Sequence, residues 1–357
     1  MRLCRAVARG FRLPLNLAVN AQKDPQGHPL CSAAAPPGSE IIIAGGGPSG
    51  AAAAIAARLE DRNVTLFEKS RFPRHKVCGE FLSPEIAPIL EQLGVWGNFN
   101  TAAPARIRRL VLRFRAREKR CNLPETAYGL SRYAFDDLLL RAASTAGAGI
   151  IHQPAEQNAQ IIAHGRKFTS PRGRRLFGFK AHFEGPPNDD VELFFFDRFY
   201  VGLNQVENGI TNICGLGPED LLRARRFEID EVLNSFAPMR ERLAPLRRTM
   251  EWLNVGPLVF ENRLHSDDGA YYAGDALSFV DPFTGSGMLS AVLTGRLAGI
   301  AASRKTPTRD YLNECRQRLE RPFLMSSIFR KALSAGWAEP LASLIPGSWL
   351  VRLTRPA

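Results

Sequence analysis

Near residue 40 the chain carries a short apolar run, then a cluster of glycines, then an alanine-rich segment. Residues 41–44 are Ile-Ile-Ile-Ala, residues 45–50 are Gly-Gly-Gly-Pro-Ser-Gly, and residues 51–59 are mostly alanine. A short, wholly apolar run is typical of a strand buried in a parallel sheet, and alanine favours helix. Residues 63–67 predict a second buried strand, which ends at Glu68. The order strand, turn, helix, strand predicts an α/β fold.

The middle of the chain changes to short segments rich in β-branched and aromatic residues, which predict strands. They are residues 176–183, 191–196, 199–206 and 210–216. Residues 207–209 (Glu-Asn-Gly) are a hairpin signal between the last two. We therefore expect an antiparallel sheet. Phenylalanine dominates this region, with three in a row at residues 194–196. We expect each of them in the core, although so much aromatic surface leaves an apolar substrate open.

The last third of the chain returns to helical patterns. Residues 270–273 predict a short strand, and residues 288–302 predict a helix that begins at a second glycine cluster. The tail, residues 306–357, mixes apolar side chains with arginine and lysine, and its prolines at 340 and 346 predict broken helices. We expect this tail to pack on the core. Two alternatives remain for its apolar faces: they could cover a substrate pocket, or they could contact a membrane surface.

Composition narrows the class of protein. The chain has 357 residues, 45% hydrophobic and 23% charged, which excludes a disordered, collagen-like or coiled-coil protein and predicts one large or two closely packed domains. Its formal charge of +12 favours anionic partners. No segment predicts a transmembrane span. The six cysteines show no disulfide or metal-site spacing, so we expect a reducing, cytoplasmic setting and no metal.

Residues 1–39 form a separate region. Arg2, Arg5, Arg9 and Arg12 precede the first acid at Asp24, as in an organelle transit peptide, although a start codon assigned too early gives the same pattern. Prolines and glycines between residues 25 and 40 are typical of a linker. We expect the folded part to begin near residue 40, and organelle targeting remains open.

The first glycine cluster has the spacing Gly-x-Gly-x-x-Gly between a strand and a helix. Gly45 permits a tight turn, Gly47 lets the backbone approach a pyrophosphate, and Gly50 lets helix and strand pack closely. Glu68, at the end of the next strand, is placed to bind an adenosine ribose, which disfavours a 2′-phosphate. The segment predicts a site for FAD or NAD.

The second glycine cluster predicts another anion-binding helix N-terminus. Gly274 and Asp275 follow a predicted strand, and Pro282, Gly285 and Gly287 lead into the predicted helix. Backbone N–H groups at such a terminus stabilise negative charge, as on a reduced flavin. Asp275 is placed to hold a ribityl chain.

With both glycine clusters in place, residues 40–357 resemble the FAD-dependent oxidoreductases that include geranylgeranyl reductases and the aromatic-hydroxylase type of flavoprotein monooxygenase. Residues 73–79 (Pro-Arg-His-Lys-Val-Cys-Gly) resemble a segment that lies against the flavin in the geranylgeranyl-reductase branch, and Arg132 resembles an arginine that contacts the cofactor. The resemblance implies FAD, with NAD(P)H as a transient electron donor because no second dinucleotide motif is present. It also implies a Rossmann-like FAD-binding domain with an inserted antiparallel-sheet substrate domain and a helical C-terminal tail.

The motifs and the resemblance together give expected boundaries and contacts. We expect a basic extension at 1–39, a discontinuous FAD-binding domain at 40–105, 128–170 and 262–305, a substrate-domain sheet at 106–127 and 171–261, and a helical region at 306–357. The expected cofactor contacts are Gly45, Gly47, Ser49, Gly50, Glu68, Lys69, Arg74, Arg132, Gly274, Asp275, Pro282, Gly285 and Gly287.

Three residues are candidates for catalysis: Cys78, Glu80 and His182. A buried cysteine is more often a small apolar group than a proton donor. Lys180 and His182 share one face of a strand, which leaves open both an active-site position and a solvated surface.

We expect reduction of a carbon–carbon double bond in an apolar, isoprenoid- or polyketide-like substrate, with electrons from NAD(P)H or a protein donor. Hydroxylation of an aromatic substrate is the alternative. The absence of a Trp-x-Trp-x-Ile-Pro segment disfavours a halogenase.

One departure from the family leaves a non-catalytic protein open. Only about a dozen residues, 150–161, stand where relatives carry a strand and a hairpin, and His164 replaces an aspartate. Such a deletion would weaken the cofactor-domain sheet and FAD binding.

The basic stretch 106–120 predicts a strand with one solvated cationic face, or a docking surface for an anionic carrier protein or lipid. No recognition motif accompanies it, so we expect no nucleic acid partner.

Overall fold

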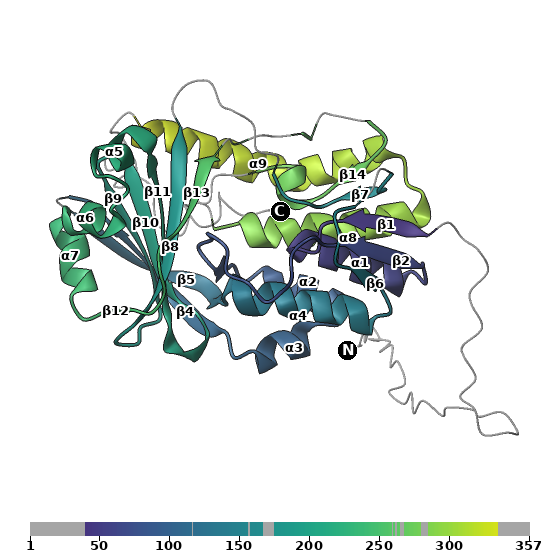
Figure 1. Cartoon of the computed structure of the whole chain (residues 1–357), viewed down its shortest axis with the longest axis horizontal. Coiled ribbons are helices and arrows are strands. Elements are labelled where there is room, and N and C mark those ends of the chain that lie inside the picture. Colours follow the sequence, from purple (N-terminus) through teal and green to yellow (C-terminus); the bar gives the residue numbers. More distant parts are fainter. Residues whose placement is uncertain are drawn as a thin grey trace, which may run out of the picture. The chain divides into compact units, whose positions relative to one another are not determined.

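The computed structural model describes residues 40–115, 117–155, 158–166, 175–258, 260, 263–264, 268–279 and 285–334. Two sheets, one parallel and one mixed, lie at opposite ends of this part of the chain (Figure 1). The fold is α/β, with a Rossmann-like sheet, a second sheet and C-terminal helices, as expected from the sequence.

The first sheet is parallel and has the strand order β14-β7-β1-β2-β6. Its strands are β1 (Ile41–Ala44), β2 (Val64–Phe67), β6 (Gly149–Ile151), β7 (Ile161–Ile162) and β14 (Tyr271–Tyr272). The short connection after β6 still leaves β7 between β1 and β14. The short connection at residues 150–161, which the sequence suggested to be a deletion, therefore does not prevent this sheet from forming.

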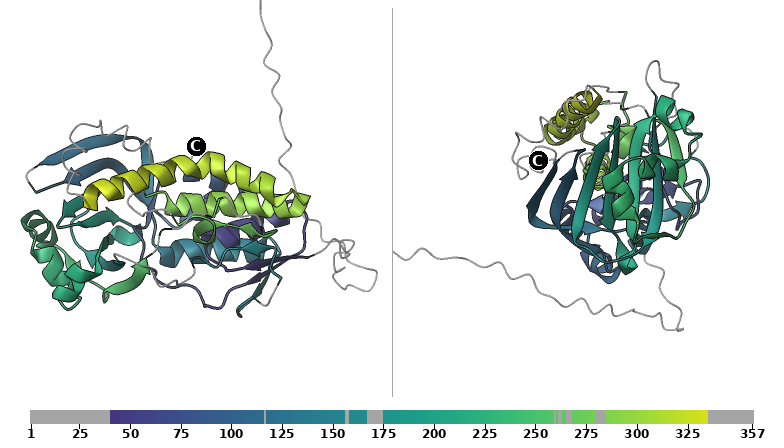
Figure 2. Two further views of the ribbon diagram at one scale, coloured as in Figure 1. Left: turned by 90° about the horizontal axis from the view of Figure 1, so that it is seen from above. Right: turned by 90° about the vertical axis from the view of Figure 1, so that its left-hand side faces the viewer.

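Helices α1 (Pro48–Leu59) and α8 (Gly287–Arg304) pack against this sheet and against each other, and the other helices extend this layer. The others are α2 (Ile86–Gln92), α3 (Trp96–Thr101), α4 (Arg132–Thr145) and α9 (Thr308–Ser334), with the 3₁₀ turn η2 at Gly274–Ala276. The alanines of α1 are buried because α8 packs closely against them. A Cβ on Gly295 of α8 would lie 2.0 Å from the Ser49 carbonyl oxygen, so this contact requires glycine. Figure 2 (left) shows α9 running alongside α8.

The second sheet has nine strands in the order β12-β8-β11-β10-β9-β4-β5-β3, with β13 also paired to β8. Its strands are β3 (Phe81–Leu82), β4 (Ala105–Arg113), β5 (Glu118–Gly129), β8 (Leu176–Glu184), β9 (Asp190–Phe196), β10 (Phe199–Gln205), β11 (Thr211–Pro218), β12 (Arg247–Arg248) and β13 (Leu253–Leu258). The four strands predicted between residues 176 and 216 are confirmed. The 3₁₀ turn η1 (Glu207–Gly209) joins β10 to β11 at the expected hairpin.

The sheet is mixed and not wholly antiparallel, because β4 and β9 pair in parallel. The chain between them is long and passes through the first sheet, which gives the crossover that a parallel pair requires. The short helices α5 (Glu219–Ala224), α6 (Ile229–Asn234) and α7 (Ala237–Leu243) cover the outer face (Figure 2, right). Phenylalanines of this face, Phe179, Phe183, Phe194, Phe196 and Phe199, form a core beneath these helices.

The predicted cationic strand is β4, and Arg108, Arg109 and Arg113 on it form ion pairs with acids. Arg109 binds Asp189 and Asp190, and Arg113 binds Glu192 on the neighbouring strand. This pairing favours the solvated-face interpretation of the basic stretch.

None of the described helices is both long and apolar enough to cross a membrane. Residues 1–39 and the predicted helix breaks at 340 and 346 lie outside the described residues.

Candidate functional site

A cavity of about 1380 Å³ opens between the two sheets. One end is lined by the glycine motif after β1 and by the start of α8, and the other by side chains of β4, β5 and β8–β11. Pockets for one small ligand span about 300–1000 Å³, so this cavity has room for more than one such molecule.

The motif requires glycine for reasons that differ from one position to the next: Gly45 and Gly47 line the cavity, whereas Gly50 lies within α1. Gly45 has φ +105°, and a Cβ there would lie 2.5 Å from the Ala163 carbonyl oxygen. A Cβ on Gly50 would lie 1.7 Å from the Gly45 carbonyl oxygen, so α1 approaches the turn only without a side chain. A Cβ on Gly47 would meet only Lys76 Nζ at 3.8 Å, and Gly47 faces the cavity. Gly47 therefore keeps space free for a ligand, whereas Gly45 and Gly50 serve the packing of the protein itself.

Glu68 is fixed beside this motif. Its Oε2 accepts a hydrogen bond from the Gly46 N–H at 2.8 Å, and its Oε1 accepts one from the Ser70 N–H at 2.8 Å. The carboxylate is 7% exposed and lines the cavity. Because two backbone groups orient it, Glu68 offers its remaining lone pairs to a ligand hydroxyl in a fixed position.

The second predicted anchor lies at the same end of the cavity, next to the first. Gly274 has φ +61° and packs on Ser49, and the Asp275 carboxylate opens into the cavity. Partial desolvation of Asp275 inside the cavity raises the pKa of its carboxyl above the ordinary value, and nearby Arg132 only partly opposes this. Gly285 and Gly287 also line the cavity, and α8 begins at Gly287. Pro282 lies outside the described residues.

Cations line the same end of the cavity. Arg132 holds Asp136 with two hydrogen bonds, of 2.5 and 2.8 Å, and Lys76 lies 3.1 Å from the same carboxylate. Burial opposes the charge of Arg132, but pairing with Asp136 outweighs it and raises the Arg132 pKa. Lys69 and Arg74 complete this group, and Arg74 Nε is buried without a hydrogen-bond partner. The excess of positive charge suits a diphosphate.

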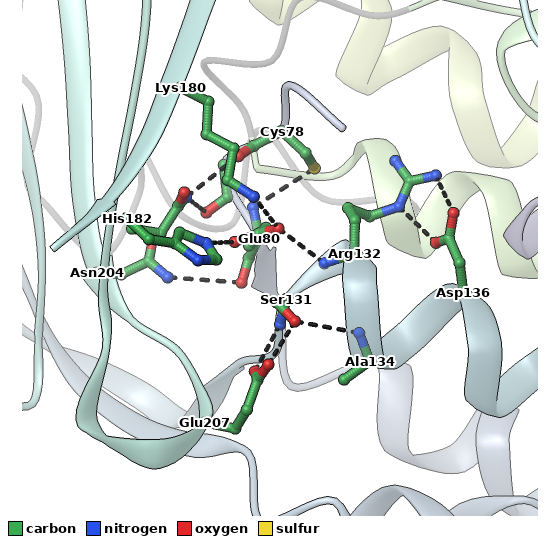
Figure 3. A network of polar contacts seen from close by, with 12 residues as sticks. Cys78, Glu80, Ser131, Arg132, Ala134, Asp136, Lys180, His182, Asn204 and Glu207 are labelled. Carbon is green, nitrogen blue, oxygen red and sulfur yellow. Dashed lines mark hydrogen bonds and ion pairs between the residues drawn. The ribbon is translucent and has the colours of Figure 1, made fainter. Parts of the chain in front are cut away.

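Glu80 is the centre of a buried polar network (Figure 3). Its Oε1 accepts hydrogen bonds from Lys180 Nζ at 2.5 Å and from the Arg132 N–H at 2.7 Å. His182 Nε2 lies 2.7 Å from Oε2. Glu80 and Lys180 are both fully buried. Burial opposes ionisation of Glu80, but the bonds to His182 and the charge of Lys180 outweigh it and lower the Glu80 pKa. Glu80 is thus an ionised anchor and not a proton donor.

The same network fixes the segment that carries Cys78. The Glu80 N–H donates to Cys78 Sγ at 3.4 Å, and the Asn212 side chain donates to the carbonyl oxygens of Cys78 and Gly79 at 3.1 and 2.9 Å. Burial raises the pKa of the Cys78 thiol, which keeps it protonated. Cys78 therefore shapes the cavity wall as an uncharged group.

His75 joins the network at the surface. The rings of His75 and His182 meet edge to face with centroids 5.1 Å apart, and the ligand atoms of His75, Glu80 and His182 lie within 4.8 Å of one another. These residue types bind zinc in other proteins. Lys180 already neutralises Glu80, however, so a divalent cation here would be buried without a compensating charge.

The structure brings together most of the residues expected from the sequence. Those of the motifs gather at one end of the cavity, and Glu80 and His182 are in direct contact beside Cys78. Sequence reasoning missed Asp136 and Asn212. Asp136 follows Arg132 by four residues on a helix, a spacing that could have indicated the pair. Nothing in the sequence indicates the contact between Asn212 and the Cys78 segment, 134 residues away.

These residues fit FAD. Gly47 leaves a cradle that a side chain would fill, Arg74 Nε is buried and unsatisfied, and Asp275 opens into the same cavity. Gly47, Glu68 and Arg74 would hold the adenosine and diphosphate end, whereas Asp275 and the start of α8 would hold the flavin end.

Comparison with known proteins agrees with this geometry. Residues 40–120 match the family model described as tryptophan halogenase. The flavin-dependent brominase Bmp2 has a TM-score of 0.71 and 17% identity, covering 88% of this chain and 93% of its own. The myxobacterial chondrochloren halogenase CndH has a TM-score of 0.67 and 19% identity, covering 85% and 82%. A variant of the halogenase PltM in complex with FAD has a TM-score of 0.64 and 14% identity, covering 83% and 76%. No curated protein matches.

The comparisons correct one expectation and limit another. The chain has the fold of flavin-dependent halogenases, so the absence of a Trp-x-Trp-x-Ile-Pro segment was too narrow a reason to set halogenases aside. Such a segment is one local feature, whereas the fold is specified by the whole pattern of strands and glycine turns. The matches support the FAD-dependent flavoprotein superfamily in general and not geranylgeranyl reductases in particular.

Proposed function

We propose that this protein is an FAD-dependent enzyme that oxidatively modifies an apolar substrate, by oxygenation or halogenation. When bound and reduced, FAD would supply the electrons that activate molecular oxygen. The observation that carries the proposal is the single cavity that joins the glycine motif to an apolar surface of the second sheet. A cofactor held by the motif would therefore face a substrate without an intervening wall.

The protein's own residues support this role in three ways. The glycine turn and Glu68 provide the dinucleotide site, and the pairs around Asp136 hold Arg132 in place beside it. The ionised Glu80, the neutral Cys78 and the buried Lys180 form a rigid wall. That wall excludes water, which protects a reactive oxidant from unproductive decay.

Reduction of a carbon–carbon double bond was expected from the sequence and has less support. The segment that carries Cys78 resembles one found in reductases. Reduction of a double bond needs a proton donor, however, and neither Glu80 nor Cys78 suits this role. Glu80 is ionised and fully paired, and the thiol of Cys78 has a raised pKa. The comparisons also support the oxidative alternative better.

The test supplies reduced FAD and measures the product. The protein is incubated with FAD, NADH, a separate flavin reductase, oxygen, bromide and a panel of uncharged phenols, indoles and pyrroles, with catalase present to remove free peroxide. Mass spectrometry should detect either the bromine isotope pair or the gain of one oxygen atom, and omission of the protein should abolish both. A product that gains only two hydrogens, formed without oxygen, would show the reductase instead.

A further inference from the structure

The face of the second sheet that borders the cavity is divided into two halves. Lys180, His182, Asn204 and Asn212 form a polar half that binds Glu80 and its neighbours. The other half is apolar and contains Leu110, Leu112, Val191, Leu193, Leu216 and Leu258, which we call the apolar chamber. The polar half is occupied by the protein's own chain, so only the apolar chamber is left for a second molecule.

Gly202 lies in the floor of the cavity, on β10 in the interior of the sheet. A Cβ there would meet Leu193 Cδ2 at 3.3 Å, the mobile end of a side chain, and no other atom within 3.7 Å. At Gly215, on the adjacent strand, a Cβ would lie 2.2 Å from the ring of Phe179. Packing therefore requires glycine at 215 but not at 202. A glycine inside a strand weakens the sheet, and it often marks a position where a ligand approaches closely.

The apolar chamber also lacks a place for a positive charge. None of its six named residues is charged, and Glu80 beside it is already paired with Lys180. Arg166 lines the cavity at the edge of the apolar chamber, where its guanidinium lies over the Phe279 ring and its Nη1 donates to the Pro257 carbonyl oxygen at 3.1 Å, next to Leu258. An ammonium group carried into the apolar chamber would lose its water beside this cation, which is strongly unfavourable.

From these observations we infer that the apolar chamber accepts an uncharged, flat ring compound lying over Gly202, and that it rejects free amino acids. This inference rests on the proposed function and specifies its substrate class. It predicts that free tryptophan, the amino acid that the matching family model names, binds poorly here, because tryptophan carries an ammonium group.

The test uses two probes with the same ring, indole and L-tryptophan, titrated into the FAD-loaded protein by calorimetry. Indole should bind at least about tenfold more tightly than tryptophan. Gly202→Leu should weaken indole binding by about tenfold or more while FAD loading is unchanged, and Gly202→Ala should have a smaller effect. Gly97→Leu, on the surface helix α3 where a Cβ meets no atom within 4 Å, is the matched control.

The two claims fail in different ways. Equal binding of both probes, or no indole binding at millimolar concentration, would overturn the inference, as would indole binding that Gly202→Leu and Gly202→Ala leave unchanged. The same titration can be run on protein without FAD. Failure to load FAD would count against the proposed function, and selective indole binding would still support the apolar chamber.

Discussion

The two sheets contribute to the cavity in different ways. The five-stranded sheet offers backbone, through Gly45, Gly47 and the start of α8. The nine-stranded sheet offers side chains, with a polar half that holds Glu80 and an apolar half left open. A backbone site recognises what many ligands share, such as a diphosphate, whereas side chains recognise one substrate. The comparison thus separates cofactor binding from substrate choice.

The same contrast appears in what each glycine would tolerate. A Cβ on Gly50 would lie 1.7 Å from a carbonyl oxygen, whereas one on Gly202 would meet only the end of a leucine at 3.3 Å. Backbone cannot move without loss of the strand–helix unit, but a leucine can change rotamer. We therefore expect substitution of Gly50 to unfold the protein and substitution of Gly202 to alter substrate binding.

The largest effect is expected from Gly50→Val. The new side chain would force α1 away from β1, and we expect a loss of about 4 kcal/mol or more in the free energy of unfolding, or no soluble protein. Chemical denaturation beside Gly97→Val measures this. A Gly50→Val protein as stable as the control would refute the assigned packing of α1.

A smaller effect is expected from Glu80→Gln, in the polar half of the second sheet. It leaves Lys180 charged and buried without its partner, which should cost about 3 kcal/mol. Because the folded pKa of Glu80 is lowered, the stabilisation is present above the unfolded pKa of about 4.3 and is lost as pH falls through the folded value.

Denaturation of the Glu80→Gln protein at several pH values checks both points. The double variant Glu80→Gln with Lys180→Met should recover part of the loss, since it removes the uncompensated charge. Equal stability of the single variant and the unaltered protein at neutral pH would show that the ion pair is not buried.

The smallest effect is expected from Asp275→Asn, where the cavity admits solvent. The raised pKa means that the folded protein binds a proton more tightly than the unfolded chain, so this carboxyl lowers stability as pH rises above about 3.9. Asn should raise the stability of FAD-free protein by about 0.5 kcal/mol at neutral pH, after allowance for solvent screening, and change nothing at low pH. Thermal melts at both pH values test this, and the opposite pH dependence would contradict it.

Local patterns predicted the first sheet well. The apolar run at Ile41–Ala44, the glycine turn and the acid at Glu68 are adjacent in sequence, and their geometry depends on backbone rules that hold in many proteins. Strands β8 to β11 of the second sheet were also predicted, because alternation and hairpin signals are local.

Contacts between distant segments were not predictable in the same way. Lys180 looked equally suited to a solvated face, and its burial depends on Glu80, 100 residues earlier in the chain. The parallel pairing of β4 with β9 and the two-residue strand β3 have no local signal either. Both follow from how the two sheets meet, which no single segment specifies.

The most direct test of the account is the visible absorption spectrum of the purified protein after incubation with FAD and removal of free cofactor. Gly47→Val is the informative variant, because Gly47 has extended backbone that valine adopts and its Cβ would enter the cavity. We predict a flavin spectrum for the unaltered protein and for Gly97→Val, and a folded but colourless Gly47→Val protein. An unaltered protein that takes up no FAD, or a Gly47→Val protein with a full flavin spectrum, would contradict the account.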